Sequence, residues 1–277
     1  MSATSTAIST LKEARYSHSL ERGLALLGCF TPDESWLGIV DMADLTGMGR
    51  STTHRYVITL VALGFLEQSA SNGRKYRVGL RVADLGMAAL NMLPVRHHAY
   101  PDLEELRRQV SYTISLAVLS GSEIVVVDRL QGFRGHAKLG LKIGLGSRLP
   151  TYCTSIGKVL LAHLPEDELD SLIRDLTLAR HGPKTIVQKG LLRDELAQIL
   201  AAGFATDDEE LAAGVHSIAM PIRSRGEVIA AASVVAPTSM IPRTHMIEDF
   251  GPHLLAAIER ISASLDNEPT DSGTESD

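Results

Sequence analysis

Two short helical segments meet at a single glycine near the start of this chain. One helix is predicted over residues 39–46 and the next over about 50–63, with Gly47 between them. Glycine can take the positive φ angle that a tight turn requires, and Ala43 is small enough to let two helices cross closely. This spacing is typical of a helix-turn-helix motif.

Another helix is predicted before this pair. Ser19 is a candidate N-cap, and Thr31-Pro32 ends the helical pattern. We expect the apolar residues at helical spacing to face the core, and these are Leu20, Leu24, Leu27 and Phe30.

Positive charge gathers around the same motif. Residues 47–81 contain six Lys or Arg and one acidic residue, whereas residues 82–277 contain 18 Lys or Arg and 26 acidic residues. The net charge of −6 argues against a protein that coats nucleic acid indiscriminately, so the positive segment indicates one localised contact. The six basic residues are Arg50, Arg55, Arg74, Lys75, Arg77 and Arg81.

The second helix of the motif presents polar residues on one side. If Thr53, Tyr56 and Val57 face inward, the opposite surface carries Arg50, Ser51, Thr52, His54 and Arg55. In helix-turn-helix proteins the N-terminal part of this helix contacts base edges, while hydroxyls, arginines and amide N–H groups hold phosphates. A solvated helix face is the alternative interpretation, but the local charge and the spacing together favour DNA.

A predicted β-hairpin follows the motif. The strands are expected at Phe65–Gln68 and Lys75–Val78, joined by a turn that contains Asn72-Gly73. Arg74 and Lys75 at its tip can lie along a phosphate backbone or in a minor groove. The whole positive segment is therefore explained by a winged helix-turn-helix.

The rest of the chain favours a second domain of α+β class. Residues 80–93 keep apolar residues at helical spacing and stop at Pro94, which predicts a helix that connects two domains. A length of 277 residues is enough for two domains. Beyond Ala99, strands are predicted near 113–119, 123–130, 216–223 and 227–236, and helices near 99–110, 154–164, 166–176, 191–202 and 245–265.

Small side chains line one face of the last two predicted strands. Ser217 and Ala219 share a face of one strand, and Ser233 lies among small residues on the other. A helix start at Thr154 and Ser155 offers free N–H groups to an anion. These features favour a small-molecule site, although a sheet packed tightly against helices would show the same pattern.

The chain shows no pattern typical of catalysis or metal binding. The acidic run 207–210 has no histidine at chelating spacing, so we expect a solvated turn or helix start. Cys29 and Cys153 lie far apart in apolar segments and are expected to stay reduced and packed. We therefore expect no enzyme, no metal and no cofactor, and a cytoplasmic location because no signal or membrane segment is apparent.

The sequence resembles the IclR-type bacterial transcriptional regulators from Ser17 to Leu265. The matching blocks are SLERGLALLGCF (Ser19–Phe30), TGMGRSTTHRYVITLVALGFL (Thr46–Leu66), YRVGLRVADLG (Tyr76–Gly86), LPTYCTSIGKVLLAHLP (Leu149–Pro165) and GFATDDEELAAGVHSIAMPI (Gly203–Ile222). The resemblance implies an N-terminal winged helix-turn-helix, a linker helix used in dimerisation, and a C-terminal GAF-like effector domain.

The resemblance also implies which residues are functional. It places the recognition helix at Ser51, Thr52, Thr53, His54 and Arg55, and the effector pocket at Ser155, Ile156, Asp207, Val215, Ser217 and Ser233. Many family members have cysteine where Ser217 stands, so the polarity of this pocket can differ from theirs. The sequence looks most like the subgroup that controls protocatechuate, 4-hydroxybenzoate and β-ketoadipate catabolism, which implies an aromatic or dicarboxylic acid effector.

These expectations define one architecture and three competing functions. The expected parts are a flexible arm (1–16), the winged helix-turn-helix (17–79), the linker helix (80–98), the GAF-like domain (99–265) and a disordered acidic tail (266–277). The favoured function is a homo-oligomeric DNA-binding regulator that senses a small organic acid. The alternatives are a small-molecule enzyme or sensor with a GAF-like catalytic domain, and a constitutive DNA-binding protein whose pocket is only packed core.

Overall fold

The structure is a computed structural model that describes residues 16–31, 34–134 and 140–267. These residues divide into two compact units, with the boundary between Met92 and Leu93. The flexible arm and the acidic tail that the sequence predicts lie outside the described residues, apart from Tyr16, Asp266 and Asn267.

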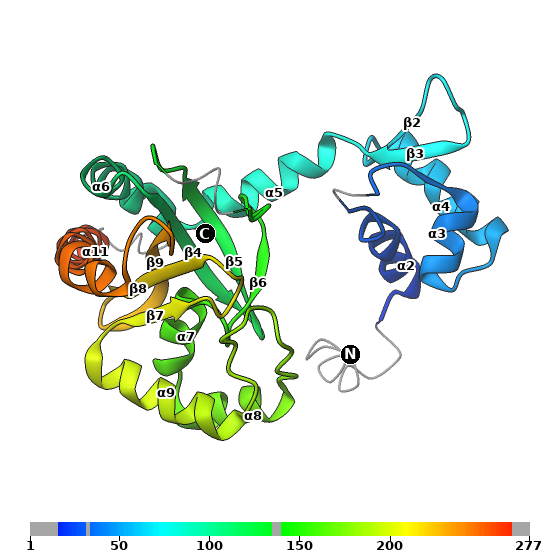
Figure 1. Ribbon diagram of the computed structural model, residues 1–277. Helices are drawn as coiled ribbons and strands as arrows, with labels where there is room; N and C mark the ends of the chain where they lie inside the picture. The colour runs from blue at the N-terminus through cyan, green and yellow to red at the C-terminus, as the bar shows by residue number, and fades with distance from the viewer. Residues whose placement is uncertain (1–15, 32–33, 135–139, 268–277) are drawn as a thin grey trace, which may run out of the picture. The chain divides into compact units, whose positions relative to one another are not determined.

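The N-terminal unit is a small helical domain with a three-stranded antiparallel sheet of order β1-β3-β2 (Figure 1). Its helices are α2 (His18–Leu27), α3 (Ile39–Thr46), α4 (Arg50–Ala62) and α5 (Arg81–Asn91). Its strands are β1 (Leu37–Gly38), β2 (Leu66–Gln68) and β3 (Lys75–Val78). Gly47 ends α3 with a φ of 69°, in the left-handed conformation that glycine adopts without strain. The predicted winged helix-turn-helix is confirmed.

Helix α2 differs from its prediction at both its start and its buried face. Ser17 caps it, because the Ser17 hydroxyl accepts a hydrogen bond from the Leu20 N–H at 3.3 Å. Leu20 and Leu24 are 63% and 59% exposed, whereas Leu26 is fully buried. Helical spacing identifies apolar residues on one face, but only the packing of α2 on α3 and α4 decides which residues are covered.

Helix α5 ends at Asn91, before Pro94 as predicted, but the next helix starts at Pro94 rather than near Ala99. Helix α6 (Pro94–Val110) begins at this proline and buries Val95 and Ala99. Proline fits the first position of a helix because its missing N–H has no partner there in any case. The C-terminal unit therefore begins before residue 99, and the linker helix is limited to α5.

The C-terminal unit is built on one six-stranded antiparallel sheet of order β6-β5-β4-β9-β8-β7, bent into a half-barrel (Figure 1). The strands are β4 (Thr113–Ser120), β5 (Glu123–Leu130), β6 (Arg148–Pro150), β7 (Ala205–Asp208), β8 (Val215–Ser224) and β9 (Glu227–Pro237). Strands β4, β5, β8 and β9 match strands predicted from the sequence, whereas β6 and β7, which are short edge strands, have no predicted counterpart.

Helices cover both faces of this sheet. Helices α6 and α11 (Gly251–Asp266) pack together on one face, and α7 (Ser155–Ala162) lies on the other, with α9 (Lys189–Ala202) against it (Figure 1). The remaining helices are α8 (Glu166–Asp175), α10 (Arg243–His245) and the π-helical segment η3 (Met246–Phe250). The predicted helix over 245–265 is thus interrupted by a π-helix.

Candidate functional site

The first turns of α4 form an exposed polar surface. Helix α4 follows its N-cap Gly49, and Arg50 and Ser51 at its start are exposed. Its exposed or partly exposed polar residues are Arg50, Ser51, Thr52, His54 and Arg55. This arrangement offers two guanidinium groups, two hydroxyls and an imidazole to one partner surface.

Thr53 does not belong to this surface. Its side chain is fully buried, and its hydroxyl donates to the Gly49 carbonyl at 3.2 Å. Thr53 faces the core with Val57, which is also fully buried. The expectation that Thr53 contacts DNA is therefore wrong, because the helix would have to leave its core to expose this residue.

The wing places its basic residues in different surroundings. Arg74 is exposed at the end of the turn, and its side chain has no ion-pair partner among the residues that the structure describes. The Lys75 ammonium, by contrast, lies 2.8 Å from an Asp41 carboxylate oxygen and holds the pKa of Asp41 below its usual value. Lys75 thus ties the wing to α3, so Arg74 is the wing cation that remains available to a phosphate.

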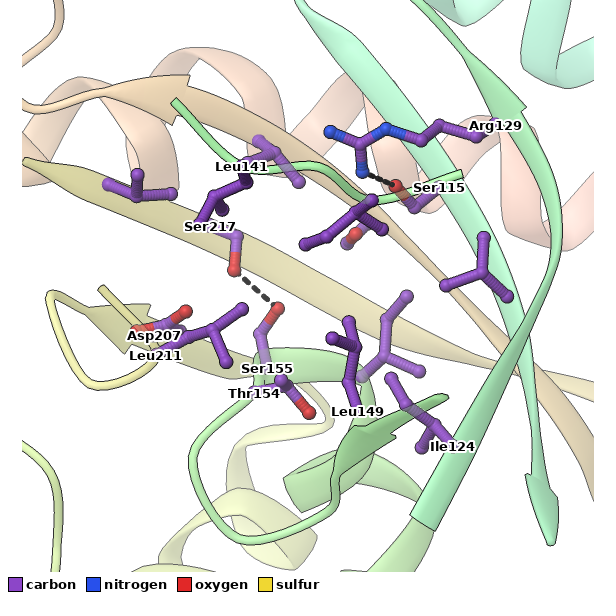
Figure 2. Close-up of a pocket in the computed structure, with 16 residues that line it drawn as sticks. Ser115, Ile124, Arg129, Leu141, Leu149, Thr154, Ser155, Asp207, Leu211 and Ser217 are labelled. Atoms are coloured by element: carbon purple, nitrogen blue, oxygen red, sulfur yellow. Dashed lines mark hydrogen bonds between the residues drawn. The ribbon is translucent and has the colours of Figure 1, made fainter. Parts of the chain in front are cut away.

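A cavity in the C-terminal unit brings all seven predicted effector residues together (Figure 2). These residues are Thr154, Ser155, Ile156, Asp207, Val215, Ser217 and Ser233. The volume that the centre of a water-sized molecule can occupy inside the cavity is about 40 Å³, and the volume reaches about 450 Å³ only when all non-atom space, including open solvent, is counted. The other lining residues are Ser115, Ile124, Val126, Arg129, Leu141, Ile143, Leu149, Leu211 and Val235. The cavity is thus largely apolar with a few polar groups, as small-molecule sites are.

The start of α7 is fixed by its own cap and by close packing. The Thr154 hydroxyl accepts from the Gly157 N–H at 3.1 Å and donates to the Pro150 carbonyl at 3.0 Å. A Cβ atom at Gly157 would lie 2.2 Å from the Thr151 carbonyl oxygen, so only glycine permits this approach. The first turn of α7 therefore stands rigidly at the cavity wall.

Two hydroxyls join this helix to the sheet. The Ser155 and Ser217 hydroxyl oxygens lie 2.6 Å apart at the cavity, and both side chains are buried. Ser233 lies on β9 and pairs with Ala219 of β8, so it shares the cavity face with Ser217. The predicted face of small, hydroxylated side chains is confirmed.

Asp207 and Glu210 are buried, which contradicts the predicted solvated turn or helix start. Asp207 is only 3% exposed on β7, and its carboxylate accepts a hydrogen bond from the Glu210 N–H at 2.8 Å. Burial raises the pKa of Asp207 to about 7. The prediction fails because Asp207 belongs to strand β7, which pairs with β8. This pairing joins residues that are distant in the sequence, so the local acidic pattern does not reveal it.

A buried ammonium group balances the second of these acids. Lys158 on α7 is fully buried, and its Nζ lies 2.6 Å from Glu210 and 2.9 Å from Glu195 of α9. These ion pairs connect α7 to α9 and to the turn after β7. Helix α7, whose first turn lines the cavity, is therefore held in place by a buried network of ion pairs.

Arg129 and Ser115 are two polar residues of the cavity that the sequence analysis misses. The Arg129 guanidinium donates to the Ser115 hydroxyl at 3.0 Å (Figure 2). Strict alternation along β5 would place Arg129 on the opposite face from Ile124 and Val126. A β-bulge in the β4–β5 pairing changes this, and no local sequence signal marks it.

The described residues contain no group of three or more His, Cys, Asp or Glu side chains that could hold a metal ion. Cys153 is fully buried, and burial raises the pKa of its thiol to about 12. A thiol of that pKa is a poor nucleophile because the thiolate is the reactive form. Within the part of the chain that the structure describes, no helix is long and apolar enough to cross a membrane.

A winged helix-turn-helix with a polar α4 surface, followed in the chain by a domain with a largely apolar cavity, is the architecture of a DNA-binding transcriptional regulator. The family described as bacterial transcriptional regulator IclR C-terminal matches residues 87–263, and the IclR helix-turn-helix domain matches residues 19–70. The chain therefore belongs to the IclR family of bacterial transcriptional regulators.

Individual relatives agree with this assignment. The chain is 34% identical to the HTH-type transcriptional regulator XynR of Escherichia coli over 80% of its length and 87% of that protein. It is 31% identical to the Pca regulon regulatory protein of Pseudomonas putida, over 86% of this chain and 81% of that one. A crystal structure of an IclR homolog complexed with 4-hydroxybenzoate from Microbacterium hydrocarbonoxydans matches with a TM-score of 0.79 and 29% identity, covering 90% of this chain and 100% of that chain.

Proposed function

We propose that the protein binds a specific DNA operator as a homo-oligomer and that a small organic acid in the C-terminal cavity controls this binding. The single observation that carries the proposal is the joint lining of one cavity by residues from α7, β7, β8 and β9 in a chain that also bears an exposed recognition helix. Selection of bound duplexes from a random-sequence DNA library would test it. We expect enrichment of one repeated motif, whereas no enrichment would contradict sequence-specific binding.

For the DNA contact, we assign base reading to the exposed residues at the start of α4 and phosphate binding to the wing. The base-reading set consists of Arg50, Ser51, Thr52, His54 and Arg55. Arg74 contacts phosphate, and Lys75 has a lesser role because it already pairs with Asp41. This division follows the usual roles of the two elements in winged helix-turn-helix proteins.

For oligomerisation, we assign the contact to α5. This helix buries none of its residues: Leu85 is 61% exposed and Ala89 is exposed, as is Met92 directly after the helix. An isolated helix of this length is marginal in water, so a covering partner would stabilise it. A symmetric dimer also places two recognition helices on repeated half-sites. A single short recognition helix contacts only a few base pairs, so specific binding needs two copies. Sedimentation should give a dimer or a dimer of dimers, and a tightly binding monomer would refute this assignment.

For the effector, we propose an aromatic or dicarboxylic acid of aromatic catabolism. The cavity is apolar with polar groups at its edges, and relatives include the Pca regulon regulatory protein and the 4-hydroxybenzoate complex. A constitutive DNA-binding protein would show no ligand-induced rise in melting temperature. An enzyme would turn over these acids, whereas a regulator leaves them unchanged.

A further inference from the structure

The β-bulge on β5 turns one arginine into the cavity. Ala117 of β4 pairs with Val126, whereas Leu116 pairs with Asp128 and Ser115 pairs with Arg129. Val127 is thus the extra residue on β5, and the alternation of faces restarts after it. Arg129 joins Ile124 and Val126 on the cavity face, while Asp128 faces the other way.

The Arg129 guanidinium has no negatively charged partner among the described residues. Its side-chain hydrogen bond goes to the neutral Ser115 hydroxyl at 3.0 Å. The neighbouring Asp128 carboxylate instead lies 3.8 Å from Arg96 Nε. Burial lowers the pKa of Arg129, yet a guanidinium stays protonated in proteins. A partly desolvated cation without a counter-ion is costly, so this position favours an anionic ligand.

The far end of the cavity carries the opposite polarity. Figure 2 shows Ser155, Ser217 and Asp207 away from the Arg129–Ser115 pair. Strand β9 separates β4 from β8, so Ser115 and Ser217 lie about two strand spacings, on the order of 10 Å, apart. Apolar side chains such as Ile124, Leu149 and Val235 also line the cavity.

An acid group is disfavoured at the Asp207 end. The buried Asp207 carboxyl already accepts the Glu210 N–H there, and a ligand carboxylate beside it would repel Asp207 whenever Asp207 is ionised. One N–H of the first turn of α7, that of Gly157, is also taken by Thr154. A hydroxyl, in contrast, can donate to Asp207 or exchange hydrogen bonds with the serine pair.

We propose that Arg129, supported by Ser115, binds the carboxylate of the effector, while Ser155, Ser217 and Asp207 bind a neutral hydroxyl at its other end. This inference rests on the proposed acid-sensing function and narrows it: the cavity selects a hydroxylated aromatic monocarboxylic acid over a dicarboxylic acid. It also reverses the sequence-based expectation, which places the acid group at the N-terminus of α7.

Calorimetry on the full-length protein tests this with four probes of similar size. The probes are 4-hydroxybenzoate, its neutral counterpart 4-hydroxybenzamide, benzoate and terephthalate. We expect the unmodified protein to bind 4-hydroxybenzoate at least about tenfold more tightly than the other three. Arg129→Met should remove the preference for acid over amide and leave amide affinity unchanged. Arg129→Lys should restore part of the preference, since it keeps the charge but not the planar fork.

Two controls keep the outcome unambiguous. Arg174→Met removes an exposed arginine of α8 that does not line the cavity, and it should leave all four affinities unchanged. Arg129→Met should keep the unmodified melting temperature, because it removes a cation without a counter-ion. An unchanged acid-to-amide ratio in Arg129→Met, or terephthalate binding more tightly than 4-hydroxybenzoate, would overturn the inference alone. Failure of all four probes to bind the unmodified protein would overturn the proposed acid sensing and the inference with it.

Discussion

The hydroxyl oxygens of Ser155 and Ser217 lie 2.6 Å apart, although 62 residues separate them in the sequence. This contact joins the first turn of α7 to strand β8, directly at the cavity. We therefore expect a ligand that binds between α7 and the sheet to displace or extend this hydrogen bond. Such a change would couple occupancy of the cavity to the position of α7.

Filling the cavity beside Ser155 and Ser217 should abolish the effector response without affecting DNA binding. Ser217→Phe places a ring where Ser155 and the cavity now meet, so we expect no ligand-induced change in operator affinity while basal operator affinity persists. Ser217→Ala, which keeps the volume and removes one hydroxyl, should weaken the response but retain it. Anisotropy titrations with labelled operator measure both effects. An intact response in Ser217→Phe would place the effector elsewhere.

The base-reading role of α4 predicts a sequence-dependent loss. Arg50→Ala or Arg55→Ala should weaken operator binding by about 1 to 3 kcal/mol if the arginine pairs with a guanine edge, because only the operator presents that edge in register. Affinity for a random duplex should change much less. Equal losses on both duplexes would instead assign the residue to phosphate.

Substitutions in the wing should weaken binding to operator and random DNA equally, unlike those in α4. Arg74→Ala should lower affinity for all duplexes alike and reduce the slope of log affinity against log salt by about one. Lys75→Ala should have a smaller effect, since its ammonium is already 2.8 Å from Asp41. Salt titrations of each variant with operator and random DNA separate these cases. A Lys75 effect larger than that of Arg74 would contradict the roles assigned here.

The buried network beneath α7 predicts a large loss of stability. Lys158→Met leaves the buried Glu210 without its cation, so the free energy of unfolding should fall by about 3 to 5 kcal/mol. Lys158→Met combined with Glu210→Leu removes both charges and should recover much of this loss. Lys189→Met on the exposed start of α9 is the control and should have little effect. Urea unfolding of the four proteins measures the differences, and a mild effect of Lys158→Met would contradict the buried ion pair.

The raised pKa of Asp207 predicts a pH dependence of stability. Its pKa is about 7 in the folded protein against an ordinary value of 3.8, so between these values the folded state holds a proton that the unfolded state has released. The free energy of unfolding should therefore fall as pH rises from about 4 to about 7 and level off above that. Asp207→Asn should remove this contribution, whereas Asp194→Asn on exposed α9 should not. Equal slopes in the unmodified protein and Asp207→Asn would refute it.

Local signals explain what could be predicted from the sequence. Gly47, Asn72-Gly73 and the Thr154 cap each act within a few residues, and the helices and hairpin around them are where the sequence analysis places them. The seven cavity residues follow from strand alternation, the helix start at Thr154 and Ser155, and the family resemblance taken together. Long-range packing explains the failures: the exposure of Leu20 and the burial of Thr53 depend on neighbouring helices.

The two polar ends of the cavity also depend on long-range packing, which the local sequence does not reveal. Asp207 is buried because β7 pairs with β8, and Arg129 reaches the cavity because of a bulge opposite β4. Neither event leaves a mark in the residues that immediately flank it. The local sequence pattern predicts solvent exposure for both residues. Asp207 lies in an acidic run, and simple alternation along β5 places Arg129 on the face opposite Ile124 and Val126.

The central claim is that a ligand in the C-terminal cavity controls sequence-specific DNA binding. The most direct test is the affinity of the full-length protein for the DNA upstream of its neighbouring genes and for a random duplex of equal length, each with and without 4-hydroxybenzoate. We predict tighter binding to the upstream DNA and a change in that affinity when the acid is added, with an equal reciprocal change in acid affinity when DNA is bound. Equal affinity for the two duplexes, unchanged by the acid, would contradict the account.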